Sequence, residues 1–396
     1  MNETPEPIRF IQAIEVIMGV ICELADLQKL YHRRVPKMFQ GYCESGSWTQ
    51  QTLAENMSDF QKIRFRQRVA RDLEPRTLQT SLAGSDAKMP LAIAPVGLLG
   101  MQHADGEIHA ARAAEKFGVP FTLSTMSICS IEKVAEATQS PFWFQLYVQR
   151  DRDFTKKLVD RAKAVECSAL VVTLDLQMIG KRHADHRNGM TAPPRLTIPN
   201  ILDIARRPRW AMNMLATKNR EFGNIQGSAA DVDDMNDLMK WVGASFDPKL
   251  SWDDIKRFRD LWDGPLIIKG IMETSDAEEC VKLGAEALVV SNHGGRQLDG
   301  ARSAISVVPE IAAAVGEDIE VWMDGGIRSG QDIIRARGMG AKGVMVGRPV
   351  VYGLGAMGEA GVTRMLEIFH EEAELTMAFI GHREIGAVCR DDMVVG

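Results

Sequence analysis

Eight short apolar runs between residues 91 and 348 constrain the fold more than any other feature of the sequence. Each run is rich in Val, Ile, Leu or aromatic residues, and helical patterns such as 106–118 lie between most of them. Continuous apolar runs are typical of strands that are buried on both faces, as in parallel sheets. The eight runs are 91–98, 121–125, 142–148, 169–175, 265–271, 287–292, 319–325 and 343–348. Eight strand–helix repeats predict an α/β fold, a (β/α)8 TIM barrel, with a doubly wound open sheet as the structural alternative.

Two regions of the chain do not fit the repeat. Residues 19–90 precede the first strand and are expected to form an N-terminal helical extension that packs on the barrel. The gap of 175–265 between the fourth and fifth strands is too long for one strand–helix connection. We therefore expect a long insertion after strand 4, at 183–250 on the active face, within a single barrel domain of 19–390.

Composition and the first residues narrow the class of protein. The formal net charge of −6 over 396 residues argues against a general nucleic-acid binder. Six scattered cysteines form no CxxC pair, so no metal site is expected, and isolated thiols suit a reducing, cytoplasmic compartment. No stretch reaches the roughly 18 apolar residues of a membrane span. The first residues lack the basic region of a signal peptide, and because Met18 is a candidate initiator, 1–18 are expected to lie outside the fold.

The predicted insertion is basic within an otherwise acidic chain. Residues 181–220 contain nine Lys or Arg residues and two acids, a local balance of +7. Within them, 196–216 mixes three arginines with Trp210, methionines and leucines. Such a segment is typical of a surface that lies on an anionic membrane. A solvated loop that packs its apolar side on the barrel fits the same pattern equally well.

Polar and ionisable side chains stand at the carboxyl ends of seven of the eight predicted strands. Active sites of TIM barrels collect at that edge. One histidine there is more often structural than catalytic, but seven coincident polar ends indicate a ligand site. In chain order, these residues are Ser124, Gln145, Tyr147, Thr173, Asp175, Lys269, Ser291, His293, Asp324 and Arg348.

The last two strand ends predict a phosphate site. Glycines in DGGIRSG (324–330) let the backbone approach a ligand, and Arg328 there and Arg348 in GRP (347–349) match phosphate oxygens. Barrels commonly hold phosphate between the loops after strands seven and eight. A tight turn that needs glycine only for its backbone angles is the alternative. The pair of motifs therefore predicts a phosphorylated ligand or cofactor.

Two arginines and two tyrosines suit a carboxylate on the other side of the predicted mouth. Arg182 and Arg296 offer guanidinium groups that match a carboxylate, and Tyr42 and Tyr147 offer phenolic hydroxyl groups. The sequence therefore predicts an anionic substrate that lies opposite the phosphate site.

Three further ionisable groups indicate proton transfer beside a cofactor. His293 can take up a proton near neutral pH, and Asp175 is expected on a neighbouring part of the rim, where it can stabilise the resulting imidazolium. Lys269 supplies a cation that can stabilise negative charge developing on a bound cofactor. A buried ion pair is the alternative role for Lys269.

These residues, in this order, resemble the FMN-dependent L-2-hydroxy-acid dehydrogenase/oxidase family over about residues 19–385. The family includes respiratory L-lactate dehydrogenases, mandelate dehydrogenase and glycolate oxidase. SNHGGRQLDG (291–300) is the most specific element, and FWFQLYV (142–148), DGGIRSG and GRP support it in the expected order. The resemblance implies a TIM barrel that binds FMN and forms a homotetramer.

The resemblance also implies a role for each matching residue. The catalytic residues would be His293 as the base, Asp175 as its partner, Lys269 beside the flavin, and Tyr147 near the substrate hydroxyl. The substrate carboxylate would be held by Tyr42, Arg182 and Arg296, together with Tyr147. FMN would contact Pro95, Val96, Gly97, Ser124, Gln145, Thr173, Lys269, Asp324, Gly326, Arg328, Gly347 and Arg348, with Ser291 in support.

The implied reaction oxidises an L-2-hydroxy acid, with lactate as the first candidate, to the 2-oxo acid and passes the electrons to quinone or cytochrome. Gly97, where many oxidases of the family have alanine, and the basic insertion resemble the membrane-associated dehydrogenases, and imply a peripheral place on the inner face of the cell membrane. An O₂-using oxidase is the alternative. Met126 and LDLQMIG (174–180) depart from many members and leave the substrate side chain open.

Other classes of protein remain as alternatives to the predicted 2-hydroxy-acid dehydrogenase. A type 2 isopentenyl-diphosphate isomerase or an IMP-dehydrogenase-like enzyme shares the phosphate motifs, but neither needs His293, Arg296 and Arg182. A flavin-binding scaffold without turnover does not need a complete set of catalytic groups. Reduction of bound flavin by an L-2-hydroxy acid separates these alternatives from the predicted enzyme.

Overall fold

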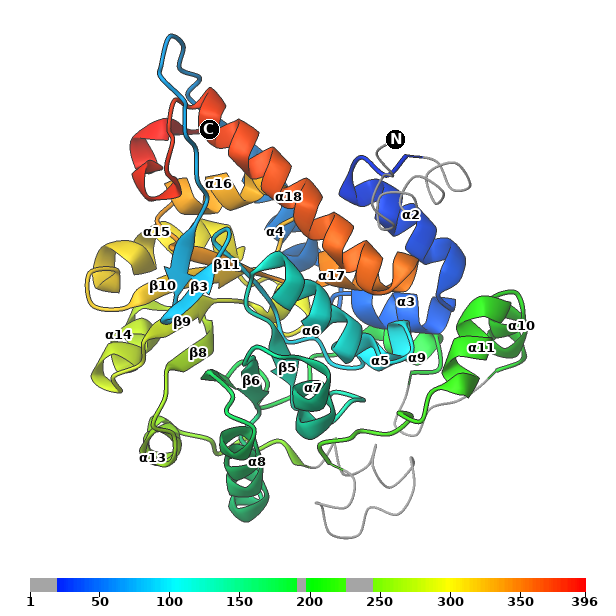
Figure 1. Ribbon diagram of the computed structural model, residues 1–396. Coiled ribbons are helices and arrows are strands. Elements are labelled where there is room, and N and C mark those ends of the chain that lie inside the picture. Colours follow the sequence, from blue (N-terminus) through cyan, green and yellow to red (C-terminus); the bar gives the residue numbers. More distant parts are fainter. Residues whose placement is uncertain (1–19, 191–196, 226–244) are drawn as a thin grey trace.

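The structure, a computed structural model, describes residues 20–190, 197–225 and 245–396, and its centre is a closed barrel of parallel strands (Figure 1). The strands pair in the order β4-β11-β10-β9-β8-β7-β6-β5, and a parallel bridge between Ile93 and Phe121 joins the two ends of this sheet. The bounds are β4 (Leu91–Ile93), β5 (Thr122–Ser124), β6 (Trp143–Leu146), β7 (Ala169–Thr173), β8 (Leu266–Ile271), β9 (Ala287–Val290), β10 (Glu320–Asp324) and β11 (Gly343–Val346). Each strand falls inside one of the eight predicted runs, and the TIM-barrel prediction is confirmed.

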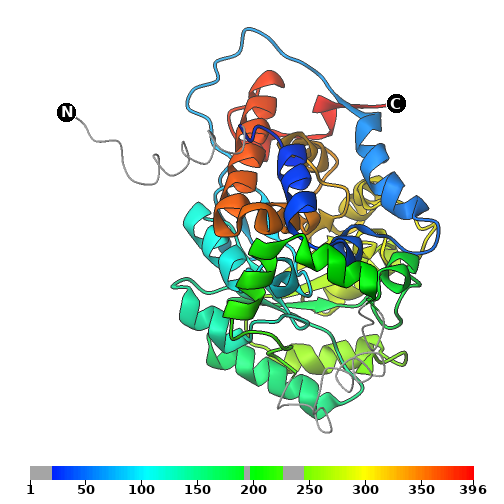
Figure 2. The same cartoon turned by 90° about the vertical axis from the view of Figure 1, so that its right-hand side faces the viewer.

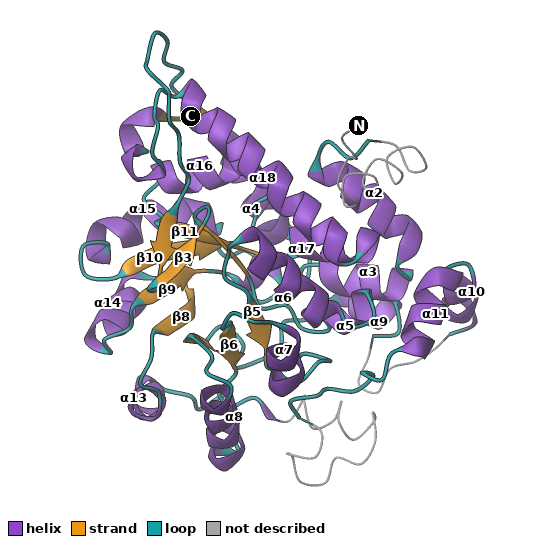
Figure 3. Ribbon diagram, in the orientation of Figure 1, coloured by secondary structure: helices purple, strands orange, loops and turns teal. Residues whose placement is uncertain are grey.

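Helices surround the strands on the outside of the barrel (Figure 3). They are α5 (Leu99–Gln102), α6 (Gly106–Phe117), α7 (Ile131–Ala137), α8 (Arg152–Ala164), α13 (Trp252–Leu261), α14 (Thr274–Lys282), α15 (Ala304–Val315), α16 (Gly330–Gly338), α17 (Arg348–Met357) and α18 (Glu359–Phe379). Helix α17 starts directly after β11 and is an addition to the strand–helix repeat. The 21-residue helix α18 then packs between α16 and α6, in the position of the eighth barrel helix.

Two tryptophans fill the amino end of the barrel interior. The rings of Trp143 and Trp322 stack with centroids 5.4 Å apart, and small residues on the neighbouring strands leave room for them. The hairpin of β2 (Thr80–Leu82) and β3 (Ser85–Ala87) closes this end, since Ser85 Oγ accepts a hydrogen bond of 3.2 Å from Trp143 Nε1. The sequence predicted helix, and no hairpin, in this part of the N-terminal extension.

The rest of the N-terminal extension reaches the opposite, carboxyl edge of the barrel. It forms α2 (Leu24–Arg34), α3 (Lys37–Glu44), α4 (Gln51–Ser58) and the 3-10 turn η1 (Asp59–Lys62). The amides of Asn56 on α4 and Asn292 after β9 exchange two hydrogen bonds of 2.8 Å. Strand β1 (Ile63–Phe65) then pairs with β12 (Met393–Val395), after the short turns η3 (Ile385–Ala387) and η4 (Arg390–Asp392).

The insertion after β7 forms short helices on the outer surface. These are α9 (His183–Arg187), α10 (Ile198–Ala205) and α11 (Pro208–Ala216), and Figure 2 shows α10 and α11 in green, facing the viewer. Trp210 on α11 packs on Phe39 of α3, with ring centroids 5.3 Å apart, and donates a hydrogen bond to Met101 O. The predicted extension of 1–18 and part of the predicted insertion lie outside the described residues. No helix of the described part of the chain is both long and apolar enough to cross a membrane.

We predict that Trp322→Ala lowers the free energy of unfolding by about 3–5 kcal/mol, because it leaves a cavity inside a closed barrel and removes the stack on Trp143. Urea unfolding followed by circular dichroism measures the change. Leu375→Ala is the control, since Leu375 on α18 is 55% exposed and the expected change is within about 0.5 kcal/mol. Equal stability of the two variants would show that the tryptophan pair does not support the barrel.

Candidate active site

A buried lysine connects three strands at the carboxyl edge of the barrel. Lys269 on β8 lies with its Nζ 3.0 Å from Asp324 Oδ2 on β10 and 3.9 Å from Asp175 Oδ2 just after β7. It also donates a hydrogen bond of 3.0 Å to Ser291 Oγ after β9. The sequence predicted Lys269 at the end of its strand, but β8 continues to Ile271 through a register shift at Gly270. At Gly270 a Cβ atom would lie 2.8 Å from Asp175 Cβ, so this close approach requires glycine.

The two carboxylates keep this buried lysine charged. Burial opposes the charged form of Lys269, but Asp324 and then Asp175 raise its pKa above the ordinary value. Burial also opposes ionisation of Asp175, but His293 and Lys269 hold the pKa of Asp175 below its ordinary value. Both groups are therefore ionised at neutral pH, and the site contains a fixed positive charge next to fixed negative ones.

His293 lies in a turn whose backbone is held in the left-handed region. The φ angles of His293, Gly294 and Gly295 are 58°, 64° and 74°. This turn, η2 (His293–Gly295), follows β9 at once, and Ser291 Oγ accepts a hydrogen bond from His293 N. The ring atom Nδ1 lies 2.7 Å from Asp175 Oδ1. Because the carboxylate engages Nδ1, the other ring nitrogen, Nε2, is the one available for a proton of a substrate.

Two arginines and Tyr42 form the predicted carboxylate site. The guanidinium of Arg296 lies 4.9 Å, and that of Arg182 5.8 Å, from the centroid of the Tyr42 ring. All three residues line the same pocket as His293 and Tyr147. Burial raises the pKa of Tyr147, so its phenol is protonated and can donate a hydrogen bond. The structure thus brings together the substrate-binding residues that the sequence predicted.

The predicted phosphate site contains two arginines that form no ion pair within the described residues. Arg328 is half-buried in the loop after β10, and Arg348 is the first residue of α17. Burial, then Arg328 and Arg296, lowers the pKa of Arg348 to about 9. All three guanidinium nitrogens of Arg348 donate to backbone carbonyls, those of Cys43, Gly294 and Ser45. Arg348 therefore ties α3 to the His293 turn, a role that the sequence did not predict.

Three buried polar atoms around this pocket, and the glycines at one end of it, fit a flavin mononucleotide. Gly325 and Gly326 have φ angles of 86° and 85°, and a Cβ on Gly326 would lie 1.9 Å from Asn56 O, so the close approach of α4 requires glycine here. Gln145 Nε2, Thr173 Oγ1 and Asp324 Oδ1 are buried and have no hydrogen-bond partner among the described residues. Buried polar atoms are normally paired. A ring edge with donor and acceptor atoms, and a ribityl chain, would pair them.

One pocket of about 1240 Å³, including its open mouth, contains most of the predicted residues. Asp175, Gln145 and Ser291 are the exceptions, because they lie behind the wall and contact the lining residues His293, Ser124 and Lys269. The predicted residues that line it are Tyr42, Pro95, Val96, Gly97, Ser124, Tyr147, Thr173, Arg182, Lys269, His293, Arg296, Asp324, Gly326, Arg328, Gly347 and Arg348.

The sequence did not predict Phe246 in the apolar wall of this pocket, whereas Leu176 and Ile179 of that wall belong to LDLQMIG (174–180), the segment expected near the substrate side chain. Phe246 comes from the far end of the insertion, and its ring meets that of Tyr147 edge to face at 5.6 Å. No residue pattern marks Phe246, since only the return of the chain to the barrel places it here.

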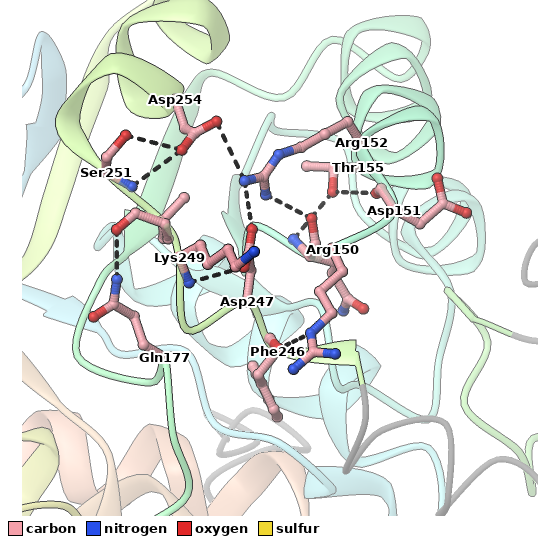
Figure 4. Close-up of polar contacts among 12 residues, drawn as sticks. Arg150, Asp151, Arg152, Thr155, Gln177, Phe246, Asp247, Lys249, Ser251 and Asp254 are labelled. Carbon is pink, nitrogen blue, oxygen red and sulfur yellow. Dashed lines mark hydrogen bonds and ion pairs between the residues drawn. The ribbon is translucent and has the colours of Figure 1, made fainter.

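A polar network fixes the segment that carries Phe246 (Figure 4). Arg150, after β6, donates from its backbone N to Ser245 O and from Nε to Phe246 O, at 2.9 and 3.0 Å. Arg152 pairs with Asp247 at 2.6 Å and with Asp254 on α13 at 3.2 Å. The end of the insertion is therefore held on the barrel rim, and Phe246 has a defined place in the pocket.

Comparison with known families identifies the fold and the cofactor together. Residues 31–395 match the model of the FMN-dependent dehydrogenase family. The chain belongs to this family. It is an FMN-dependent dehydrogenase, so the predicted family, FMN cofactor and enzyme class are confirmed.

Individual relatives cover nearly the whole chain. This chain is 41% identical over 376 residues to an L-lactate dehydrogenase of Vibrio parahaemolyticus and 43% identical to one of Actinobacillus pleuropneumoniae. Both alignments cover 95% of this chain, and they cover 99% and 98% of the two relatives. Among solved structures, the monotopic membrane protein (S)-mandelate dehydrogenase superposes with a TM-score of 0.91 at 33% identity. Mandelate oxidase with (S)-4-hydroxymandelic acid gives 0.82 at 35% identity. The two alignments cover 95% of this chain and 100% and 99% of those chains.

We predict that Asp175→Asn costs about 3–5 kcal/mol of unfolding free energy near neutral pH, because Lys269 and His293 lose a buried anionic partner. The folded pKa of Asp175 is depressed, so its contribution is present above its unfolded pKa of about 3.9 and is lost as the pH falls through the folded pKa. The difference from the wild type should therefore be largest above about pH 4 and shrink below it.

Urea unfolding at a series of pH values measures this difference. Asp391→Asn, at an exposed position of η4, is the control and should show little difference at any pH. A constant difference between Asp175→Asn and the wild type across the acid range would contradict the assigned role of the Asp175 charge.

Proposed function

We propose that this protein oxidises an L-2-hydroxy acid, with L-lactate as the first candidate, to the 2-oxo acid. The observation that supports this most is the contact of 2.7 Å between His293 and Asp175 in a pocket that also holds Arg182 and Arg296. A base and two carboxylate-binding cations around one cavity match a substrate that carries a hydroxyl group next to a carboxylate. The L-lactate dehydrogenases among the relatives support the same choice.

The reaction follows from the positions of these residues. Arg182, Arg296 and the Tyr42 hydroxyl would hold the substrate carboxylate, and the Tyr147 phenol would lie near the substrate hydroxyl group. His293 removes a proton, and Asp175 stabilises the resulting imidazolium. FMN, when bound, would supply the acceptor for the electron pair of the α-carbon, and Lys269 would place positive charge next to it. A hydride transfer and a carbanion route use these residues equally well.

FMN would be held by residues at both ends of the pocket. The backbone of Pro95, Val96 and Gly97, with Thr173 and Gln145, would contact the ring. The ribityl chain and phosphate would meet a second group, which consists of Asp324, Gly326, Arg328, Gly347 and Arg348, while Ser124 and Ser291 support the two ends. The charges of Arg328 and Arg348 suit a phosphate dianion.

The proposed electron acceptor is a quinone or a cytochrome, and O₂ is the alternative. Gly97 lines the pocket without a side chain, as in dehydrogenase members of the family. Reoxidation after anaerobic reduction distinguishes the two acceptors. When air is admitted, the yellow colour of the flavin returns at once in an oxidase. An isomerase or a scaffold is the further alternative, and its flavin would stay oxidised with every 2-hydroxy acid.

We predict that His293→Gln retains FMN but reduces the rate of flavin reduction by about 10²–10⁴-fold, because base catalysis is lost. Anaerobic stopped-flow measurement at 450 nm with L-lactate, L-mandelate and glycolate gives the rate. His370→Gln, on α18 and outside the pocket, is the control and should keep the wild-type rate. Full-rate reduction in His293→Gln would refute the proposed function.

The helices of the insertion support a peripheral membrane contact through 196–216, on the inner face of the cell membrane. Five apolar side chains of α10 and α11 are 55% to 75% exposed, namely Ile198, Ile201, Leu202, Met212 and Leu215. Arg206 and Arg209 are exposed between them. The inward packing of Trp210 fits the loop interpretation, but this second apolar face fits an anionic bilayer.

A homotetramer is proposed as the assembly.

We predict that the double variant Ile201→Asp, Leu215→Asp weakens binding to vesicles of phosphatidylglycerol and phosphatidylethanolamine by about 10²–10⁴-fold. Each exposed side chain would lose roughly 1.5–3 kcal/mol of burial in the bilayer. Vesicle sedimentation measures binding, and flavin reduction by substrate should not change. Leu375→Asp, on a different face, is the control. Equal vesicle binding by all three proteins would exclude this surface as the membrane contact.

A further inference from the structure

Asp185 is a buried acid that no step of the proposed reaction uses. It is 7% exposed, and its Oδ2 lies 2.8 Å from Arg182 Nε. Its Oδ1 is buried and has no hydrogen-bond partner in the described part of the chain. Burying a carboxylate is costly unless it is paired. The pair that offsets this cost is the one that Asp185 forms with Arg182, a residue of the substrate pocket.

The contact between α9 and α3 fixes this pair relative to Tyr42. Arg182 is the N-cap residue of α9, and Asp185 lies in its first turn. At Gly41 on α3 a Cβ atom would lie only 2.0 Å from the side-chain nitrogen of Asn188, the C-cap residue of α9. The two helices therefore touch, and Tyr42, the residue after Gly41, places its ring beside the guanidinium of Arg182.

The charges around this contact need an anion. Burial, followed by the like charge of Arg182, lowers the pKa of Arg296, so the two guanidiniums repel each other. Burial raises the pKa of Asp185, while Arg182 and then Arg296 lower it. With Asp185 ionised, the three groups carry a net charge of +1, which one substrate carboxylate neutralises.

We propose that Asp185 is a positioning residue, which holds the Arg182 guanidinium in the orientation that receives the carboxylate of the substrate. This inference rests on the proposed function and extends it to a residue of the insertion. An arginine side chain has many rotamers, and a carboxylate at Nε restricts the plane of the guanidinium. The Tyr42 ring on the neighbouring helix limits its movement from a second side.

The test compares Asp185→Ala with Asp185→Asn in the FMN-loaded enzyme. Asp185→Ala should raise both KM for the best L-2-hydroxy acid and the inhibition constant of pyruvate, a monocarboxylate, by about 10–100-fold. The limiting rate of flavin reduction should change much less, because His293 and Asp175 remain in place. Asp185→Asn keeps an oxygen that can accept from Arg182 Nε, and its effect should be smaller.

Asp203→Asn is the matched control. Asp203 is the other acid of residues 181–220 and forms an ion pair with Arg207, and neither Asp203 nor Arg207 lines the pocket. Flavin content and the thermal midpoint show whether each variant is folded. Wild-type KM and pyruvate inhibition in Asp185→Ala would overturn the proposal, as would a lower limiting rate with unchanged KM.

Failure of the proposed function is distinguishable from failure of this inference. If no L-2-hydroxy acid reduces the wild-type flavin, the proposed function fails, whatever the Asp185 variants do. Pyruvate binding to the oxidised protein, measured by the change in the flavin spectrum, still tests the role of Asp185. Weaker pyruvate binding in Asp185→Ala than in Asp203→Asn supports its role, and equal binding refutes it.

Discussion

The ion pairs of Lys269 are the interaction on which the rest of the site depends. A cation buried in a barrel interior is stable only with anionic partners, and Asp324 and Asp175 come from the ends of two other strands. This requirement fixes Asp175 where its second oxygen meets His293. The base is therefore placed by the same charge that would face a flavin ring. Replacing Lys269 by an apolar residue would leave two carboxylates without a buried cation.

Both ends of the pocket carry positive charge that the described residues do not neutralise. Arg328 and Arg348 form no ion pair within the described residues, which suits a phosphate that arrives with two negative charges. At the other end, Arg182 and Arg296 exceed Asp185 by one charge, which suits a monocarboxylate. The middle, from Lys269 to His293, contains paired charges. The two ends are not independent, because Arg296 lowers the pKa of Arg348 and both guanidiniums donate to Ser45 O.

The barrel and most of its site could be predicted from the sequence because both depend on residue patterns within short stretches of the chain. Buried parallel strands give apolar runs, and their polar ends meet at one edge, so Thr173, Lys269 and His293 were predicted together. Three features had no local signal. The β2–β3 hairpin forms in a stretch without alternation, Phe246 reaches the pocket only through the return of the insertion, and Arg348 donates to carbonyls of residues some 300 positions away in the chain.

The basic insertion illustrates why charge patterns alone are ambiguous. The positive charge of 181–220 predicted a surface, yet Arg182 lines the pocket and is a proposed ligand of the substrate carboxylate, while Arg207 is neutralised by Asp203. Arg206 and Arg209, in contrast, are exposed beside the exposed apolar side chains of α10 and α11. The same segment docks through Trp210 on α3, the helix that carries Tyr42. The proposed membrane surface and the proposed carboxylate site thus share one support, because both pack on α3.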